Sequence, residues 1–551
     1  MTLMQRIPLT ILCITLAACG GGGGIETQTT ITPPEPAPPS PLVFLDSIPK
    51  DNSSNVAGYQ TRFDLVHQGE TNANYEIRST CQATTFTVLR DVMDQADQTS
   101  DQLVNHKVTC TEASTSATSH EISVNSTIAN DSFEGQISFE TVSDQPNLNI
   151  IQTRENTTTD VDAMFSTYIA GALLDELDLP ILAELVILTF IVDLASSAWQ
   201  NLGNPDASVD VLAQRVEYSS VDPDGVANHN LSGLIAFPDA DDFTNREQII
   251  VLTHATGSTP SLLENSDAWY ILANLFAAHG YLVIAPDNFG RGNTADAPET
   301  YLLANRTGNN AIDLVLRVLQ DDTYRPFYND EDITLDIIGY SQGGHSATAS
   351  WLVLLRHHPN LQTSAVHLGG APFDLYKTFR GVLQTVNGNC DEDDYCSLVD
   401  PATHVPFATD RILPGMIEFT DVGISLDDVV DGEALDDAFV SGFLEGNSDY
   451  DNLRSLLQLN SFTNISNSEA VFNDPNTTLH LYHSEFDRLV PAANTEDFLK
   501  VLNGNVAAVH HNNECNSNSF RLIFEAIDKV GVIHTLCGLN MLDEVFAELR
   551  Q

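Results

Sequence analysis

Five consecutive residues, Gly339-Tyr340-Ser341-Gln342-Gly343, constrain the fold of this chain more than any other feature. They follow the apolar run Thr334–Ile338 and precede a small-residue segment, Gly344–Leu355. The first segment predicts a short buried strand and the second a helix. A glycine on each side of Ser341 removes Cβ atoms that would clash in a sharp strand-to-helix turn, so the serine can take a strained backbone conformation. We therefore expect the Ser341 hydroxyl to project clear of a sheet, at the positive end of a helix.

Apolar runs of strand length alternate with helical segments from about residue 212 onward. A hairpin with its turn at residues 222–225 comes first. Four later runs of strand length are rich in apolar residues: 248–253, 281–285, 364–368 and 479–483. Continuous apolar strands separated by helices predict a mostly parallel, doubly wound sheet with both faces covered. Ligands of such sheets bind at the carboxyl ends of the strands, which is where Ser341 lies.

Composition divides the rest of the chain into segments of different character. The predicted organisation is a signal peptide (1–18), a Gly/Pro-rich tether (19–41), a small β-rich domain (42–158), a helical linker or cap segment (159–211), the first part of the sheet domain (212–374), a cap or lid insertion (375–470) and the second part of the sheet domain (471–551). The β-rich assignment depends on short alternating runs such as Thr85–Leu89. The apolar stretch from 170 to 199 is interrupted by Glu184 and Asp193, so we expect a buried or cap-forming helix. An interfacial helix that contacts lipid substrate is the alternative.

The N-terminal segment has the features of an export signal. Arg6 precedes the apolar run Ile7–Leu16, and two alanines then lead to Cys19. This arrangement resembles a bacterial lipoprotein signal. The resemblance implies that Cys19 becomes the lipid-bearing first residue, anchoring the protein to a membrane without spanning it. Because Gly20 follows the cysteine, the resemblance implies an outer-membrane lipoprotein on the periplasmic or cell-surface face; an ordinary secretory signal cut elsewhere is the alternative.

The charge balance excludes one class of partner. Asp and Glu number 76 against 23 Lys and Arg, a formal net charge of −53. Such a surface repels nucleic acid and anionic ligands. Because the acidic residues are scattered, they predict a solvated surface and not a calcium-binding array.

Six cysteines remain once Cys13 is lost with the signal and Cys19 is acylated. An even number in an exported protein favours disulfides. Order along the chain suggests these pairs, although other pairings are possible: Cys81 with Cys110, Cys390 with Cys396, and Cys515 with Cys537. No C-x-x-C pair with histidine neighbours occurs, so no metal is expected at these cysteines.

A serine hydroxyl is a weak nucleophile and needs a neutral imidazole to take its proton and an acid to orient that imidazole. The best acid after Ser341 is Asp487, which lies just past a predicted strand and before a helix. A loop at that point can turn the carboxylate toward the strand ends. Glu485 is the rival acid.

The imidazole has several candidates. His534 precedes the predicted terminal helix Leu539–Leu549, and it is our first choice. His510 and His511 end a predicted strand and compete for the role, whereas His345 is expected to be a helix or pocket residue. A Cys515–Cys537 disulfide would hold the segment that carries His534.

The oxyanion of a tetrahedral intermediate needs hydrogen-bond donors. One is the backbone N–H of Gln342, next to Ser341. The other is expected from the loop 254–258, with Thr256 as first choice and Ala255 as second. No metal or organic cofactor is required for this chemistry.

Four motifs follow one another along the chain: His254-Ala255-Thr256-Gly257, the segment 285–290, the turn at Ser341 with Gln342-Gly343-Gly344, and Gly369-Gly370-Ala371-Pro372. In this order they resemble secretory lipases and related α/β-hydrolases, and the resemblance covers roughly residues 212–551. It implies an α/β-hydrolase fold with a cap/lid insertion, and the order Ser, acid, His along the chain. Ala255 stands where the family often has glycine, which leaves the identity of the second oxyanion donor open.

These observations predict a carboxylic ester hydrolase, a lipase or esterase, that acts on an ester or lipid through a covalent acyl-enzyme. The same three residues would also serve a polyester or aromatic-ester hydrolase or a serine peptidase, and a fold does not choose among them. A non-enzymatic surface binding module is the alternative from another class.

Overall fold

The computed structural model describes residues 40–57, 62–70, 74–79, 82–89, 101–109, 118–128, 131–142, 146–177, 207–239, 248–328, 333–390, 395–397, 399–463, 472–502, 506–513, 515 and 531–549. The predicted signal peptide with Cys19, most of the tether, the cysteines Cys81 and Cys110, and the apolar stretch beyond residue 177 lie outside these ranges.

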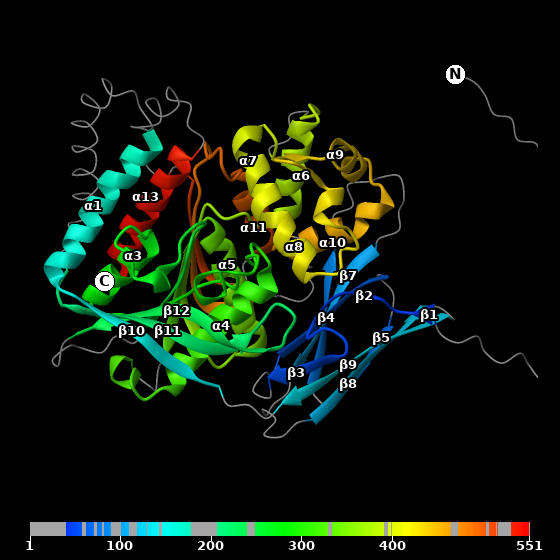
Figure 1. The fold of residues 1–551 in the computed structure, drawn as a ribbon, viewed down its shortest axis with the longest axis horizontal. Helices are drawn as coiled ribbons and strands as arrows, with labels where there is room; N and C mark the ends of the chain where they lie inside the picture. Colours follow the sequence, from blue (N-terminus) through cyan, green and yellow to red (C-terminus); the bar gives the residue numbers. More distant parts are fainter. Residues whose placement is uncertain are drawn as a thin grey trace, which may run out of the picture. The chain divides into compact units, whose positions relative to one another are not determined.

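A large sheet forms the centre of the molecule (Figure 1). Its nine strands are, in spatial order, β10 (Leu148–Asn156), β11 (Val211–Val221), β12 (Ala227–Pro238), β14 (Leu282–Pro286), β13 (Gln248–Thr253), β15 (Thr334–Tyr340), β16 (Gln362–Gly369), β19 (Asp474–Tyr482) and β20 (Val506–Asn512). From β10 to β14 neighbouring strands pair antiparallel, and from β14 to β20 they pair parallel. The predicted mostly parallel sheet is confirmed.

Strand β13 shows why the sheet is covered on both faces. Ile249 and Val251 belong to one core cluster, and Ile250 and Leu252 belong to a second one. Successive side chains of a strand point to opposite faces, so a continuously apolar strand requires a hydrophobic layer on each side.

Helices supply both layers. On one face lie α1 (Thr158–Leu177), α3 (Ala268–Ala278) and α13 (Val532–Leu549), which are grouped together in Figure 1. On the other lie α4 (Ala304–Gln320), α5 (Gln342–His357) and α11 (Ala493–Leu502). Within the part of the chain that the structure describes, no helix combines the length and apolarity that crossing a bilayer requires.

The N-terminal region contains two smaller sheets. One has the order β1 (Ser40–Pro41), β9 (Asp131–Val142), β8 (Thr118–Ile128) and β5 (Asn74–Arg78), with β3 (Ser53–Ala57) also paired to β9; the other has the order β2 (Phe44–Ile48), β4 (Arg62–Glu70), β7 (Asp101–Thr109) and β6 (Gln82–Leu89). Leu65 and Val108 from one sheet share a core with Ile122 and Ile137 from the other, so the two sheets pack face to face. Strand β10 falls in the range 42–158 that was expected to be β-rich, but it pairs with β11 of the large sheet.

An insertion follows β16 and precedes β19. It contains α6 (Leu375–Val386), α7 (Pro401–Phe407), α8 (Leu413–Phe419), the short strands β17 (Val430–Asp431) and β18 (Ala434–Leu435), α9 (Asp437–Leu444) and α10 (Asp451–Leu459). Its buried side chains are continuous with the core of the α4 and α5 face. This position agrees with the predicted cap.

The terminal helix is longer than the sequence predicts. It begins at Val532 and not at residue 539, so His534 lies in its first turn. The physical reason is a buried apolar stripe on one face of the helix, formed at helical spacing by Ile533, Cys537, Met541 and Val545. The stripe extends on both sides of Gly538, so the helix continues past this glycine. A glycine inside a helix is tolerated when packing on both sides holds it.

A buried ion pair joins the β-rich region to the large sheet domain. The guanidinium of Arg306 in α4 donates to both carboxylate oxygens of Asp46 in β2, at 2.8 and 2.9 Å. It also donates to the carbonyl oxygens of Pro223 and Phe419. Both charged side chains are almost completely buried, so each depends on the other for compensation.

We predict that Arg306→Met lowers the free energy of unfolding by about 3–5 kcal/mol, because it leaves the Asp46 carboxylate buried without its partner. Urea unfolding followed by fluorescence measures the loss. The matched control is Arg325→Met, which removes a solvent-exposed pair with Asp322 and should cost at most about 1 kcal/mol. Equal effects of the two substitutions would contradict the assignment.

Candidate active site

The turn at Ser341 has the strained geometry that the sequence predicts. Ser341 has φ 58° and ψ −124°, a conformation that non-glycine residues rarely adopt. A Cβ on Gly339 would lie 2.2 Å from the carbonyl oxygen of Gly343, and a Cβ on Gly343 would lie 2.2 Å from that of Thr253. Strands β13 and β15 and the start of α5 therefore approach more closely than side chains would allow. Ser341 stands at the positive end of α5 as a result.

Asp487 and His534 form a hydrogen-bonded pair. Nδ1 of His534 lies 2.6 Å from Oδ2 of Asp487, and Oδ1 accepts hydrogen bonds from the backbone N–H groups of Leu489 and Val490. Burial by itself would raise the pKa of Asp487, but His534 and His483 outweigh it and hold that pKa well below its ordinary value. The carboxylate therefore stays ionised and fixes the orientation of the imidazole.

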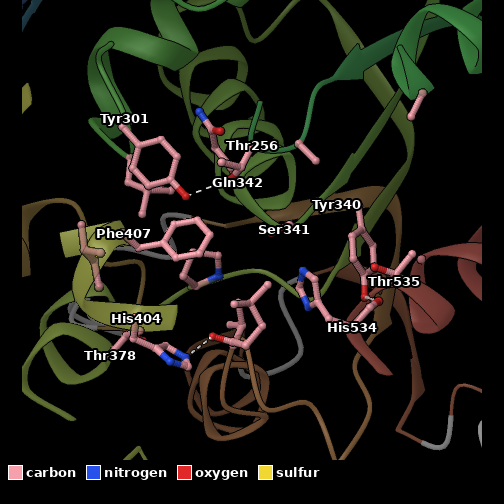
Figure 2. Close-up of a pocket in the computed structure, with 18 of the residues that line it drawn as sticks. Thr256, Tyr301, Tyr340, Ser341, Gln342, Thr378, His404, Phe407, His534 and Thr535 are labelled. Atoms are coloured by element: carbon pink, nitrogen blue, oxygen red, sulfur yellow. Dashed lines mark hydrogen bonds between the residues drawn. The ribbon is translucent and has the colours of Figure 1, made fainter. Parts of the chain in front are cut away.

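The other ring nitrogen of His534 faces the pocket that Ser341 also lines. Figure 2 shows Ser341 between Thr256 and Gln342 on one side and His534 with Tyr340 on the other. Nε2 of His534 is buried and makes no hydrogen bond to any described residue. In enzymes of this type, the hydrogen bond between the serine hydroxyl and the histidine often forms only when substrate binds. The nitrogen is thus available to accept a proton.

Tyr340 holds the first turn of α13 in place. Its hydroxyl donates to the backbone oxygen of His534 at 2.5 Å, and its ring lies 4.9 Å from the imidazole, centroid to centroid. The disulfide between Cys515 and Cys537 attaches the same helix to the segment after β20. The structure also joins Cys390 with Cys396.

The rival residues do not reach this site. Glu485 is exposed, and neither His510 nor His511 of β20 lines the pocket. His345 is buried beside the carbonyl oxygen of Asn460, and burial lowers its pKa to about 4. The first choice for each of the three positions lies at one site.

Both predicted oxyanion donors line the pocket near Ser341. Oγ1 of Thr256 lies 3.0 Å from the hydroxyl of Tyr301, and the side-chain N–H of Gln342 donates to Glu299 at 2.5 Å. Ala255 lines the pocket as well, so the second choice is also in place.

The sequence did not predict Glu299 or Tyr301. Both come from the loop between β14 and α4, beyond the 285–290 motif. Arg411 of the cap lies 3.6 Å from Oε2 of Glu299, so this carboxylate contacts both the residue after Ser341 and the insertion. Only the spacing of Glu299 and Tyr301 after the 285–290 segment could have drawn attention to them.

The pocket has a volume of about 430 Å³ and a mostly apolar wall. Side chains from both the sheet domain and the cap contribute, among them Trp269, Leu272, Leu302, Leu375, Phe379, Val382, Phe407, Ile412, Met541 and Leu542. None of the lining residues that the structure describes is Asp, Glu, Lys or Arg. The site therefore suits an uncharged, apolar group beside Ser341.

Residues 250–510 match the sequence model of the alpha/beta hydrolase family. Together with the strand order and the turn at Ser341, this match shows that the large domain has the α/β-hydrolase fold. No curated protein sequence matches the chain.

Solved structures of low sequence identity overlap much of the chain. The rice cell wall degrading esterase LipA from Xanthomonas oryzae is 16% identical, with 73% of this chain and 97% of that one covered at a TM-score of 0.47. A protein from Legionella pneumophila is 17% identical, with 74% and 98% covered and a TM-score of 0.47. Lipase A from Candida antarctica is 13% identical, with 69% and 82% covered and a TM-score of 0.37. The fold assignment does not depend on these similarities.

We predict that Gly343→Ala lowers kcat/KM for an ester substrate on the order of 100-fold, because the new Cβ must displace the Thr253 backbone and with it Ser341. Steady-state kinetics on a chromogenic ester measure the effect. Gly388→Ala is the control: open space lies around its Cβ, and its positive φ of 71°, which Gly343 does not share, makes it a test of backbone strain without a steric clash. Full activity in Gly343→Ala would contradict the packing argument.

Proposed function

We propose that this protein hydrolyses carboxylic esters with Ser341 as nucleophile, His534 as general base and Asp487 as the residue that orients His534. The observation that carries the proposal is the buried hydrogen bond that joins Asp487 to His534, which lines the same pocket as the strained Ser341. An α/β-hydrolase fold alone would not support this choice of residues.

The reaction proceeds in two halves. Oγ of Ser341 attacks the ester carbonyl while Nε2 of His534 takes the hydroxyl proton, and Asp487 stabilises the imidazolium that forms. His534 then gives the proton to the oxygen of the leaving alcohol, and the acyl group remains on Ser341. In the second half His534 removes a proton from water, which attacks the acyl-enzyme. The bond between the acyl carbon and Oγ of Ser341 then breaks, His534 gives its proton to Oγ, and the carboxylic acid is released.

Backbone groups stabilise the charge that develops on the carbonyl oxygen. The N–H groups of Gln342 and Thr256 are the proposed donors. Tyr301 holds the side chain of Thr256, and Glu299 holds that of Gln342, which limits movement of both donors. Donors that are already oriented stabilise the oxyanion without reorganisation in the transition state.

The wall of the pocket favours an ester with an apolar acyl group. Phe379, Val382 and Phe407 of the insertion extend the apolar surface away from Ser341. Burying a hydrocarbon chain there contributes about 0.8 kcal/mol for each CH₂ group. We therefore favour a lipase or esterase over a peptidase, whose substrate would bring several polar amide groups into this pocket.

We predict that Ser341→Ala and Asp487→Asn each lower kcat for p-nitrophenyl esters by about 10⁴-fold or more, since the first removes the nucleophile and the second selects the wrong imidazole tautomer. Glu485→Gln is the control, because this exposed neighbour should leave turnover unchanged. A panel of increasing acyl length, assayed beside a peptide substrate, defines the specificity. Unchanged ester turnover in Ser341→Ala would end the proposal, and cleavage of the peptide alone would replace it with a peptidase.

The second part of the proposal concerns location. Cys19 follows two alanines and an apolar segment, and the Gly/Pro-rich tether comes after it. We predict that Cys19→Ala moves the protein from the outer-membrane fraction to the soluble exported fraction, because the acyl anchor is lost. Fractionation with an esterase assay tests this, and activity per molecule should stay the same. A variant that remains in the outer membrane would contradict lipid attachment.

A further inference from the structure

Three histidines lie side by side at the far edge of the large sheet. His367 of β16 pairs in register with His480 of β19, which pairs in register with His510 of β20. Their rings stack with centroids 4.4 and 4.8 Å apart. Residues in register on neighbouring strands point to the same face, which here is the face covered by α13.

Helix α13 places a carboxylate against two of these rings. Oε2 of Glu548 lies 3.1 Å from Nε2 of His480 and 3.7 Å from Nε2 of His367. One donor atom from each of the three side chains lies within 4.8 Å of the others. Two imidazoles and one carboxylate therefore converge on a single point between the sheet and the helix.

The protein alone satisfies this arrangement poorly. His367 and His480 are buried, with 1% and 8% of their surfaces exposed, and one carboxylate oxygen faces both nitrogens. Nε2 of His480 makes no hydrogen bond of acceptable geometry, although the carboxylate is close. A buried polar atom without a hydrogen bond is costly, and a cation bound between the three groups would satisfy all of them.

The opposite nitrogen of His367 is already held. Nδ1 of His367 lies 3.2 Å from the hydroxyl of Tyr482, which belongs to β19, the strand that carries His480. A hydrogen bond to one ring nitrogen fixes the tautomer and directs the other nitrogen outward, as is usual for metal-binding histidines.

We propose that His367, His480 and Glu548 bind one divalent transition-metal ion of the Zn²⁺ class. Two imidazole nitrogens and a carboxylate oxygen form a ligand set that Zn²⁺ prefers, whereas Mg²⁺ and Ca²⁺ prefer oxygen ligands alone. Donor atoms at bond lengths of about 2.0–2.2 Å from one ion lie about 3.4 Å apart. The distances of 3.1 and 3.7 Å from Oε2 of Glu548 to the two imidazole nitrogens are close to this value, and the half-buried Glu548 at the end of its helix can adjust to it. Water completes the coordination.

The metal would have a structural role. Glu548 and His534 belong to the same helix and are separated by 14 residues, so they lie about 21 Å apart along its axis. The ion therefore takes no part in ester hydrolysis. It would attach the C-terminal end of α13 to the sheet, while Tyr340 and the Cys515–Cys537 disulfide hold the other end.

The test uses the full chain purified without a histidine tag and stripped with EDTA. Isothermal titration with ZnCl₂ should give one site per chain, and MgCl₂ should give none. Zinc at about 100 times its dissociation constant should raise Tm by about 3 °C or more. Ser341→Ala should bind zinc equally well, which separates this site from the proposed esterase function.

Variants identify the ligands. His480→Gln and Glu548→Gln should each weaken zinc binding at least 10-fold and abolish the zinc-dependent rise in Tm. Glu544→Gln is the matched control, because Glu544 lies one turn earlier on α13, accepts a hydrogen bond from Asn512 and is not part of the cluster. Each variant is first shown to be folded, by a cooperative unfolding transition in EDTA. If one of the two ligand variants does not fold, His367→Gln is tested in its place. No zinc site in the wild type, or undiminished binding in the ligand variants, would overturn the proposal.

Discussion

The close approach of three backbone segments at Ser341 is the constraint on which the rest of the site depends. Gly339 and Gly343 have no Cβ, so β13, β15 and the start of α5 can contact one another directly. This contact accompanies the strained, positive-φ conformation of Ser341, whose hydroxyl lies at the carboxyl edge of the sheet. The same contact places the first N–H groups of α5 beside the hydroxyl, where an oxyanion would form.

Two further segments complete the site, and burial gives each of them a definite position. The loop after β19 encloses the Asp487 carboxylate and supplies two backbone N–H donors to it. The first turn of α13 brings His534 to that carboxylate, with Tyr340 and a disulfide holding the turn. A buried carboxylate with a strongly lowered pKa needs these partners, so the local fold and the proposed chemistry depend on the same contacts.

Much of this could be predicted from the sequence because the signals were local. Apolar runs of strand length marked β13, β15 and β16, and glycines on both sides of Ser341 marked the turn. The sequence points to Asp487 by its place after a strand and to His534 by its place near the terminal helix, and the structure brings the two within hydrogen-bonding distance. Their catalytic roles stay predictions. The sequence predicts the terminal helix only from Leu539, whereas packing extends it through Gly538, a residue of low helix propensity, to Val532, so that it includes His534.

By itself, the sequence determined the parallel sheet and the strained turn, because strand and turn preferences depend on neighbouring residues. Only the tertiary structure decided which groups lie together across the sheet. Glu299 reaches Gln342 and Tyr301 reaches Thr256, whereas His367, His480 and Glu548 converge at the far edge, and each set comes from separate parts of the chain. Strand register and helix packing create these contacts, and neither leaves a local pattern in the sequence.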